Sequence, residues 1–242
     1  MAAQVVARFL VDRPIRPGMV RAILDTLTAQ GGAYVPELVR RSQDDSLRRV
    51  TGPRPPRLLD EVGEGGTHTT FLRVSEALPQ PVLAFSVSET PRTNPTRVAL
   101  AVPGDLLRES TEIERMLGVC KGLYLFLESV WGVAGYPDSP DKTPNVQWAN
   151  FLGPELVSRI GPARLLTSMA FIVEILPDGG IMLVTHPAPN LAATPEGTAF
   201  RLELGRVLGL DSTTAPGDNP SRLDPFQGRN APGRIRATRR SE

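Results

Sequence analysis

A thiol and two imidazoles are the side chains of this sequence best suited to covalent catalysis or metal binding. Cys120 is the single Cys, and His68 and His186 are the two His. A nucleophilic Cys needs a His base, and a zinc site needs several His, Cys or carboxylate ligands. Cys120 falls on the apolar stripe of a predicted helix, where a free Cys is usually buried and inert. His68 follows a Thr and His186 precedes Pro187, without a cluster of ligands nearby. We therefore predict no catalytic residue, no metal site and no cofactor.

Paired carboxylates are the other candidates, since two acidic groups can divide the roles of general acid and general base. The pairs are Asp44-Asp45, Asp60-Glu61 with Glu64, Glu112 with Glu114, and Asp138 with Asp141. The pairs in predicted loops have no apolar setting that would raise a carboxyl pKa. Phosphate-binding loops, dinucleotide fingerprints, metalloprotease motifs and nucleophile elbows are also missing from the sequence. We interpret the acidic loops as surface that suits a basic protein partner, and we do not expect an enzyme.

The composition excludes several further classes. The chain has 242 residues, 27 basic and 26 acidic, with a net charge of +1. Such a balance argues against a dedicated nucleic-acid binder, and one Cys excludes an intramolecular disulfide framework. The apolar stretch from Gly122 to Leu127 is too short to span a membrane, and the first residues reach Arg8 before a secretory core forms. We expect a cytoplasmic protein without membrane or direct nucleic-acid contact.

Apolar periodicity predicts the elements that would position these groups. Strands are expected at 5–11, 69–74, 82–87, 97–102, 131–136, 171–176 and 181–185. Helices are expected from Pro17 to Gly31, behind a Thr111-x-x-Glu114 capping box, from Pro154 to Gly161, and from Thr194 to Gly209. Pro177-Asp178-Gly179-Gly180 is typical of a hairpin turn.

This order predicts an α+β fold. We expect two βαββα-like halves that share a mixed or antiparallel sheet, with helices packed on one face. Residues 1–210 would form a single domain with an exposed loop at about 40–66, and 211–242 a disordered tail rich in Arg, Pro and Gly. The tail has six Arg and four acidic residues, a net charge of +2, which leaves the remainder at −1.

Three large aromatic residues, Trp131, Tyr136 and Trp148, lie within eighteen positions. Trp and Tyr are favoured anchors of protein interfaces, and they are equally suited to a core where strands meet a helix. The sequence leaves both interpretations open.

The stretch from Trp148 to Val157, Trp-Ala-Asn-Phe-Leu-Gly-Pro-Glu-Leu-Val, resembles a pattern of bacterial immunity proteins. Tyr136-Pro137 stands upstream, and the Asp178-Gly179-Gly180 turn and Pro187-Ala188-Pro189 follow downstream. The resemblance is to type VI secretion immunity proteins and the related Immunity protein 52 group, and it is best over 131–210. The segment 40–66 and the Arg-rich tail depart from it.

The resemblance implies an antidote that binds a toxin exchanged between competing bacteria, the toxin often being a nuclease. Such a protein would cover the toxin's active site. The candidate toxin contacts are Asp138, Asp141, Trp148, Asp60, Glu61 and Glu64. The alternatives are a structural or adaptor protein of a secretion or phage-like assembly, and an enzyme of unrecognised type that uses Cys120 or a carboxylate pair.

Overall fold

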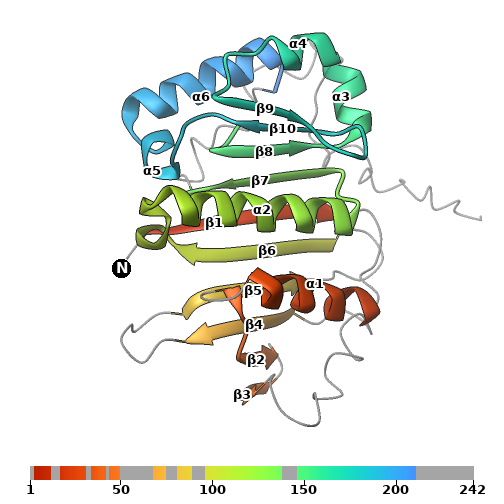
Figure 1. The fold of residues 1–242 in the computed structure, drawn as a ribbon, viewed down its shortest axis with the longest axis vertical. Helices are drawn as coiled ribbons and strands as arrows, with labels where there is room; N and C mark the ends of the chain where they lie inside the picture. The colour runs from red at the N-terminus through yellow and green to blue at the C-terminus, as the bar shows by residue number, and fades with distance from the viewer. Residues whose placement is uncertain are drawn as a thin grey trace, which may run out of the picture.

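A computed structural model describes residues 3–11, 17–30, 34–41, 44–49, 68–74, 81–88, 96–137 and 146–210. Ten strands within these ranges form one sheet in the order β3-β2-β4-β5-β6-β1-β7-β8-β10-β9, and every neighbouring pair is antiparallel. Figure 1 shows the sheet running the length of the molecule. The α+β class and the antiparallel sheet are thereby confirmed.

Seven of the ten strands begin and end close to predicted positions, whereas β2, β3 and β8 were not predicted. They are β1 (Gln4–Val11), β2 (Leu38–Arg41), β3 (Asp44–Arg49), β4 (His68–Val74), β5 (Pro81–Ser88), β6 (Thr96–Pro103), β7 (Trp131–Gly135), β8 (Ala149–Leu152), β9 (Ile172–Ile175) and β10 (Ile181–Val184). Strand β1 lies at the centre, between β6 and β7. The two halves of the chain therefore meet at the pair β1 and β7.

The helices are α1 (Pro17–Gln30), the 3-10 helix η3 (Gly104–Arg108), α2 (Ser110–Leu127), α3 (Pro154–Ile160), α4 (Pro162–Leu166), α5 (Pro189–Ala192) and α6 (Pro195–Leu208). Helix α6 begins as predicted, because the Thr194 side chain accepts a hydrogen bond from the Gly197 amide. The predicted capping box at Thr111 is wrong. Helix α2 begins at Ser110, directly after η3, and its N-cap residue is Glu109 without a side-chain cap.

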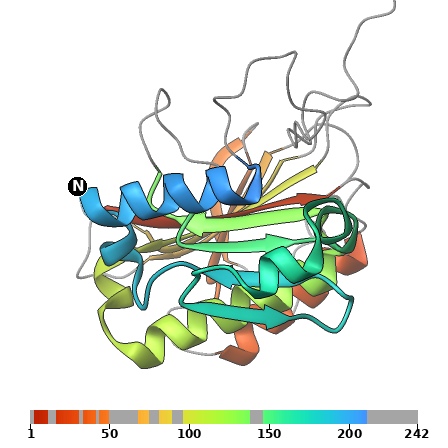
Figure 2. The same cartoon turned by 90° about the horizontal axis from the view of Figure 1, so that it is seen from above.

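The helices cover both faces of the sheet in the second half, whereas we expected them on one face. Successive residues of β10 alternate between two cores: Met182 and Val184 belong to a first core with α1 and α2. Ile181 and Leu183 belong to a second core with α3, α4 and α6. Since side chains of a strand point alternately to opposite faces, the two cores lie on opposite sides of the sheet. Figure 2 shows α6 on one side, and α1 and α2 on the other.

The segment expected to be a loop at 40–66 begins with ordered structure. Strand β3 and the end of β2 fall inside it, and β2 pairs with β4 as well as with β3. The sequence of β3, Asp-Asp-Ser-Leu-Arg-Arg, carries no apolar alternation, so its strand state depends on pairing with β2 rather than on local pattern. The rest of the predicted loop, from residue 50, and the predicted tail at 211–242 lie outside the described residues. Among the described helices, none carries an apolar stretch long enough to cross a bilayer.

Candidate functional site

The structure describes one of the six predicted toxin contacts. Asp138 and Asp141, and the acidic residues Asp60, Glu61 and Glu64, lie outside the described residues. Trp148 directly precedes β8 and has only 1% of its surface exposed. Of the two interpretations of Trp148, the structure therefore supports the core, because so buried an indole offers no surface to a partner.

Trp148 is the centre of a set of hydrogen bonds that we call the Trp148 network. The indole Nε1 donates to the His186 carbonyl over 2.9 Å, and the Trp148 carbonyl accepts from the Thr185 amide over 2.8 Å. The Asn150 side chain accepts from the Gln147 amide over 2.8 Å and donates to the Gln147 carbonyl over 2.9 Å. These contacts fix the turn that leads into β8 and join it to the end of β10.

A buried guanidinium completes the Trp148 network. Arg201 of α6 is 2% exposed, and its Nε donates to the Ala192 carbonyl over 3.0 Å. Its Nη1 donates to Gln147 Oε1 over 3.0 Å and its Nη2 to Thr198 Oγ1 over 3.3 Å. The planar fork of an Arg can satisfy several acceptors at fixed angles, which a Lys cannot do. Helices α5 and α6 are thus tied to the residues immediately before β8.

Along the chain, Tyr136 precedes the segment 138–145 and the Trp148 network follows it. Burial, followed by the charge of Asp105, raises the pKa of Tyr136. A Cβ added to Gly104 would meet the Tyr136 hydroxyl at 2.1 Å, so only a glycine leaves room for this ring. Gly104 also donates its amide to the Ala3 carbonyl over 2.8 Å. Ordered, buried contacts therefore hold the chain on both sides of the residues that include Asp138 and Asp141.

Two described residues that could do covalent or acid–base chemistry, Cys120 and His186, lie in separate parts of the structure. Cys120 is fully buried in the first core, and this burial raises the pKa of its thiol far above the usual range. His186 contacts Thr185 Oγ1 through Nδ1 over 3.0 Å, and its ring centre lies 5.2 Å from that of Phe200. Burial and the positive charge of Arg201 lower the pKa of His186. Within the described ranges, no group of three or more His, Cys, Asp or Glu could hold a metal ion.

A surface feature that the sequence did not reveal lies along β9. Several large apolar side chains near this strand are exposed, namely Leu166, Met169, Phe171 and Ile175. The hairpin of β9 and β10 was predicted, but the position of β9 at the end of the sheet was not. The one sequence signal is that Glu174 interrupts β9 whereas β10 is uniformly apolar. That difference identifies β9 as the more exposed strand only once the sheet order is known.

Comparison with known proteins gives a fold likeness and no family. No family model and no curated protein matches the chain. The solved structure of the Pseudomonas aeruginosa T6SS protein PA0821 has a similar fold, with a TM-score of 0.60 and 16% sequence identity over 90% of this chain and 77% of that chain. A chain in the structure of the toxic C-terminal tip of CdiA from Pseudomonas aeruginosa in complex with immune protein gives a TM-score of 0.36 and 13% identity, over 59% of this chain and 91% of that chain. Only the first likeness is close enough to show a shared fold.

Proposed function

We propose that the protein is a cytoplasmic immunity protein that binds a cognate antibacterial toxin delivered by a secretion system and covers its active site. A nuclease is the toxin class that we favour. The observation that carries the proposal is the Trp148 network. Trp148 and Asn150, which belong to the stretch that resembles immunity proteins, make its central hydrogen bonds. In the chain this stretch follows Asp138 and Asp141 by only a few residues. The fold shared with a T6SS protein supports it.

Inhibition by binding requires a surface held in place before the partner arrives. Preorganisation lowers the entropy lost on association, and acidic groups that face a basic cleft speed the encounter and select the partner. Gln147, fixed by Asn150 and Arg201, and Tyr136, packed against Gly104, anchor the chain on either side of residues 138–145. In the chain, Asp138 and Asp141 stand between these two anchors. Such a mechanism needs no catalytic side chain.

The first experiment asks whether the chain is an antidote. A toxin encoded beside it would be expressed alone and together with the full chain, and growth and complex formation by pull-down would be measured. We expect the toxin to arrest growth, the chain to restore it, and the two proteins to elute as one complex. Absence of both rescue and complex would remove the proposal.

The second experiment tests the acidic contacts. The double change Asp138→Lys and Asp141→Lys should weaken toxin binding by about a hundredfold or more, because it reverses two charges at the interface. The matched control is Glu155→Lys with Glu196→Lys, two exposed carboxylates at the starts of α3 and α6. The triple reversal of Asp60, Glu61 and Glu64 tests the other predicted loop in the same assay. Equal affinity for all variants would leave the antidote function intact and exclude these residues as contacts.

A further inference from the structure

The two edges of the sheet differ in chemical character. Strand β3 ends the sheet on one side with the sequence Asp-Asp-Ser-Leu-Arg-Arg, and β9 ends it on the other with Ile-Val-Glu-Ile. An edge strand has unpaired backbone groups that invite another strand, and natural proteins block such edges with charged residues. The β3 edge has this protection. The β9 edge has one charged residue, and an exposed apolar edge of this kind is a candidate site for pairing with another chain.

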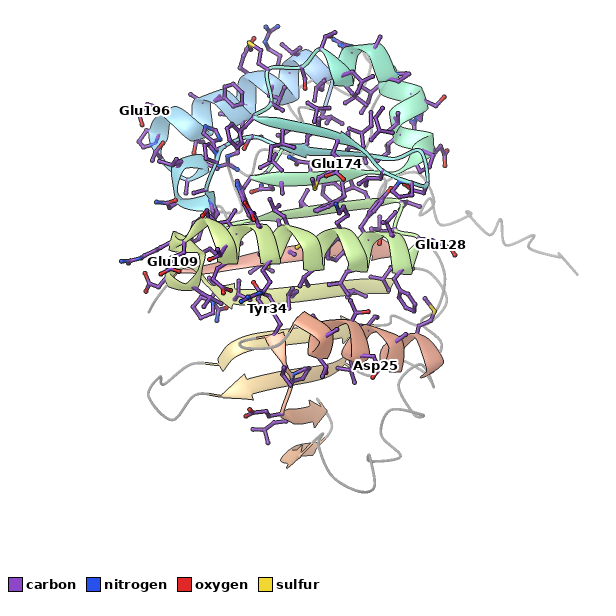
Figure 3. All side chains as sticks on the ribbon, in the orientation of Figure 1. Asp25, Tyr34, Glu109, Glu128, Glu174 and Glu196 are labelled. Carbon is purple, nitrogen blue, oxygen red and sulfur yellow. The ribbon has the colours of Figure 1, made fainter. Side chains whose placement is uncertain are left out.

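The side chains of β9 divide into a charged face and an apolar face. Glu174 is turned toward helix α2, where Lys121 Nζ lies 2.9 Å from its Oε1; Glu174 is labelled in Figure 3. Since alternate residues of a strand share a face, Val173 and Ile175 lie together on the opposite side, and Phe171 lies at a bend directly before the strand. Val173 is half-buried against the second core, whereas Phe171 is 57% and Ile175 62% exposed. The one carboxylate of the strand is therefore neutralised within its own chain, and an apolar row faces outward.

The hydrogen-bond pattern of the hairpin shows which backbone groups point to the open edge. The Leu176 amide donates to the Gly180 carbonyl over 2.8 Å, so residue 176 faces β10. In an antiparallel pair, directly opposed residues alternate between hydrogen-bonded and non-hydrogen-bonded positions. Residues 174 and 172 therefore also face β10, in register with Met182 and Val184. The amide and carbonyl groups of 173 and 175 face away from it, and among the described strands none pairs with them.

We propose that a second copy of this chain covers the edge, with β9 pairing antiparallel to β9 of the partner around Val173. In this register Val173 lies opposite the partner's Val173, and Phe171 lies opposite the partner's Ile175. Val173 and Ile175 have outward-facing backbone groups, so the central pair is a hydrogen-bonded one, and the pairing in the dimer extends the strand to Phe171. The same register places the apolar rows of both copies on one face of the joined sheet. The sequence Phe-Ile-Val-Glu-Ile is thus complementary to itself under two-fold symmetry.

Charge supports a second copy as the occupant. In this register Glu174 lies opposite the partner's Ile172 rather than opposite the partner's Glu174, so like charges do not face each other directly. Each Glu174 also keeps the ion pair with Lys121 of its own chain. Leu166 and Met169 provide further exposed apolar surface at the connection from α4 to β9. This inference does not depend on the proposed toxin binding.

The primary test is the mass of the full chain in solution, measured by sedimentation equilibrium across a wide range of protein concentration. We expect a monomer–dimer equilibrium. Ile175→Lys should raise the dimer dissociation constant at least about tenfold, because the lost cross-strand contact occurs twice per dimer. Leu202→Lys, a similar change at an exposed residue of α6, is the control and should leave dimerisation unchanged. A monomer at every concentration, or a dimer weakened by Leu202→Lys and not by Ile175→Lys, would overturn the proposal.

A cross-linking test addresses the register of the two strands without introducing a charged side chain into β9. The double change Phe171→Cys with Ile175→Cys places a thiol opposite a thiol of the partner at both ends of the strand pair. Within one chain, and between identical positions of two chains, these thiols are separated by about 13 Å, four residues of extended strand. A thiol reagent shorter than that should therefore cross-link the double variant and neither single variant. Cys120 is buried and does not compete. Equal cross-linking of the single variants would contradict the register.

Discussion

The hydroxyl of Tyr124 donates a hydrogen bond of 2.9 Å to Asp178 Oδ2, which joins the middle of the molecule to the turn between β9 and β10. The other carboxylate oxygen of Asp178 accepts from the Gly180 amide over 3.0 Å. The Tyr124 ring is buried and stacks on Phe151, with 5.6 Å between ring centres. Helix α2 thus holds the hairpin through a polar contact between a buried Tyr and an exposed residue of the turn.

Tyr124→Phe should lower the free energy of unfolding by about 0.5–1.5 kcal/mol, because it removes the hydrogen bond to Asp178, whose exposed carboxylate can bond to water instead. Urea denaturation measures the change. Tyr34→Phe is the matched control, since Tyr34 is equally buried and its hydroxyl has no hydrogen-bond partner among the described residues. That variant should be neutral or more stable. An equal loss in both variants would show that the bond to Asp178 contributes nothing specific.

Arg201→Lys should destabilise the protein by about 2 kcal/mol, because one ammonium group cannot replace the forked contacts to Ala192, Gln147 and Thr198. The melting temperature and the urea midpoint report this loss. Arg206→Lys, on an exposed turn of the same helix, should leave both values nearly unchanged. If Arg201→Lys melts at the same temperature as the wild type, the guanidinium does not stabilise the Trp148 network.

Cys120 should react with a thiol reagent only when the protein unfolds. Its side chain is inaccessible in the first core, and the raised pKa of the thiol leaves almost no thiolate at neutral pH. The labelling rate at pH 8 should be far below that of the protein in denaturing urea. Rapid modification of the folded protein would revive the view of Cys120 as an enzymatic nucleophile.

His186 should titrate below the ordinary His value of 6.5, because burial and the charge of Arg201 oppose its protonation. The folded state then binds this proton less readily than the unfolded chain. As the pH falls below about 6.5, the contribution of His186 should reduce the free energy of unfolding, down to the lower pKa of the folded state. Nuclear magnetic resonance of the two His rings measures the pKa, and His68→Gln assigns the signals. A pKa above 6.5 would contradict the packing of His186 against Arg201 and Phe200.

The elements with local signals were predicted correctly. Thr194, Pro195 and Gly209 define helix α6, and Asp178-Gly179-Gly180 defines the hairpin, with Gly179 at a positive φ of 84°. Such caps and turns act through neighbouring residues, so a short stretch of sequence contains their cause. Apolar periodicity likewise located β1 and β7 to within one residue.

The features that depend on distant partners were not predicted. Strand β8 contains Asn150 and has no alternation, because β7 and β10 on its two sides and a core on each face bury all of it. Arg201 looks like a surface residue of α6, and it is buried only because Ala192 and Gln147 supply acceptors. The exposed apolar row on β9 follows from sheet order, which pairs segments by long-range contact rather than by local pattern.

The central position of β1 constrains how the chain reaches its native state. This strand is synthesised first among the described elements, yet both of its neighbours, β6 and β7, come about ninety residues or more later in the chain. Pairing over such separations must meet a large loop-closure entropy, which slows folding. During synthesis, Val5, Ala7 and Phe9 have no partner strand until β6 emerges, and the other side of β1 stays unpaired until β7 follows. The central strand of the finished molecule is therefore the one that waits longest for its partners and is exposed longest to aggregation, so low temperature and slow expression should favour soluble product.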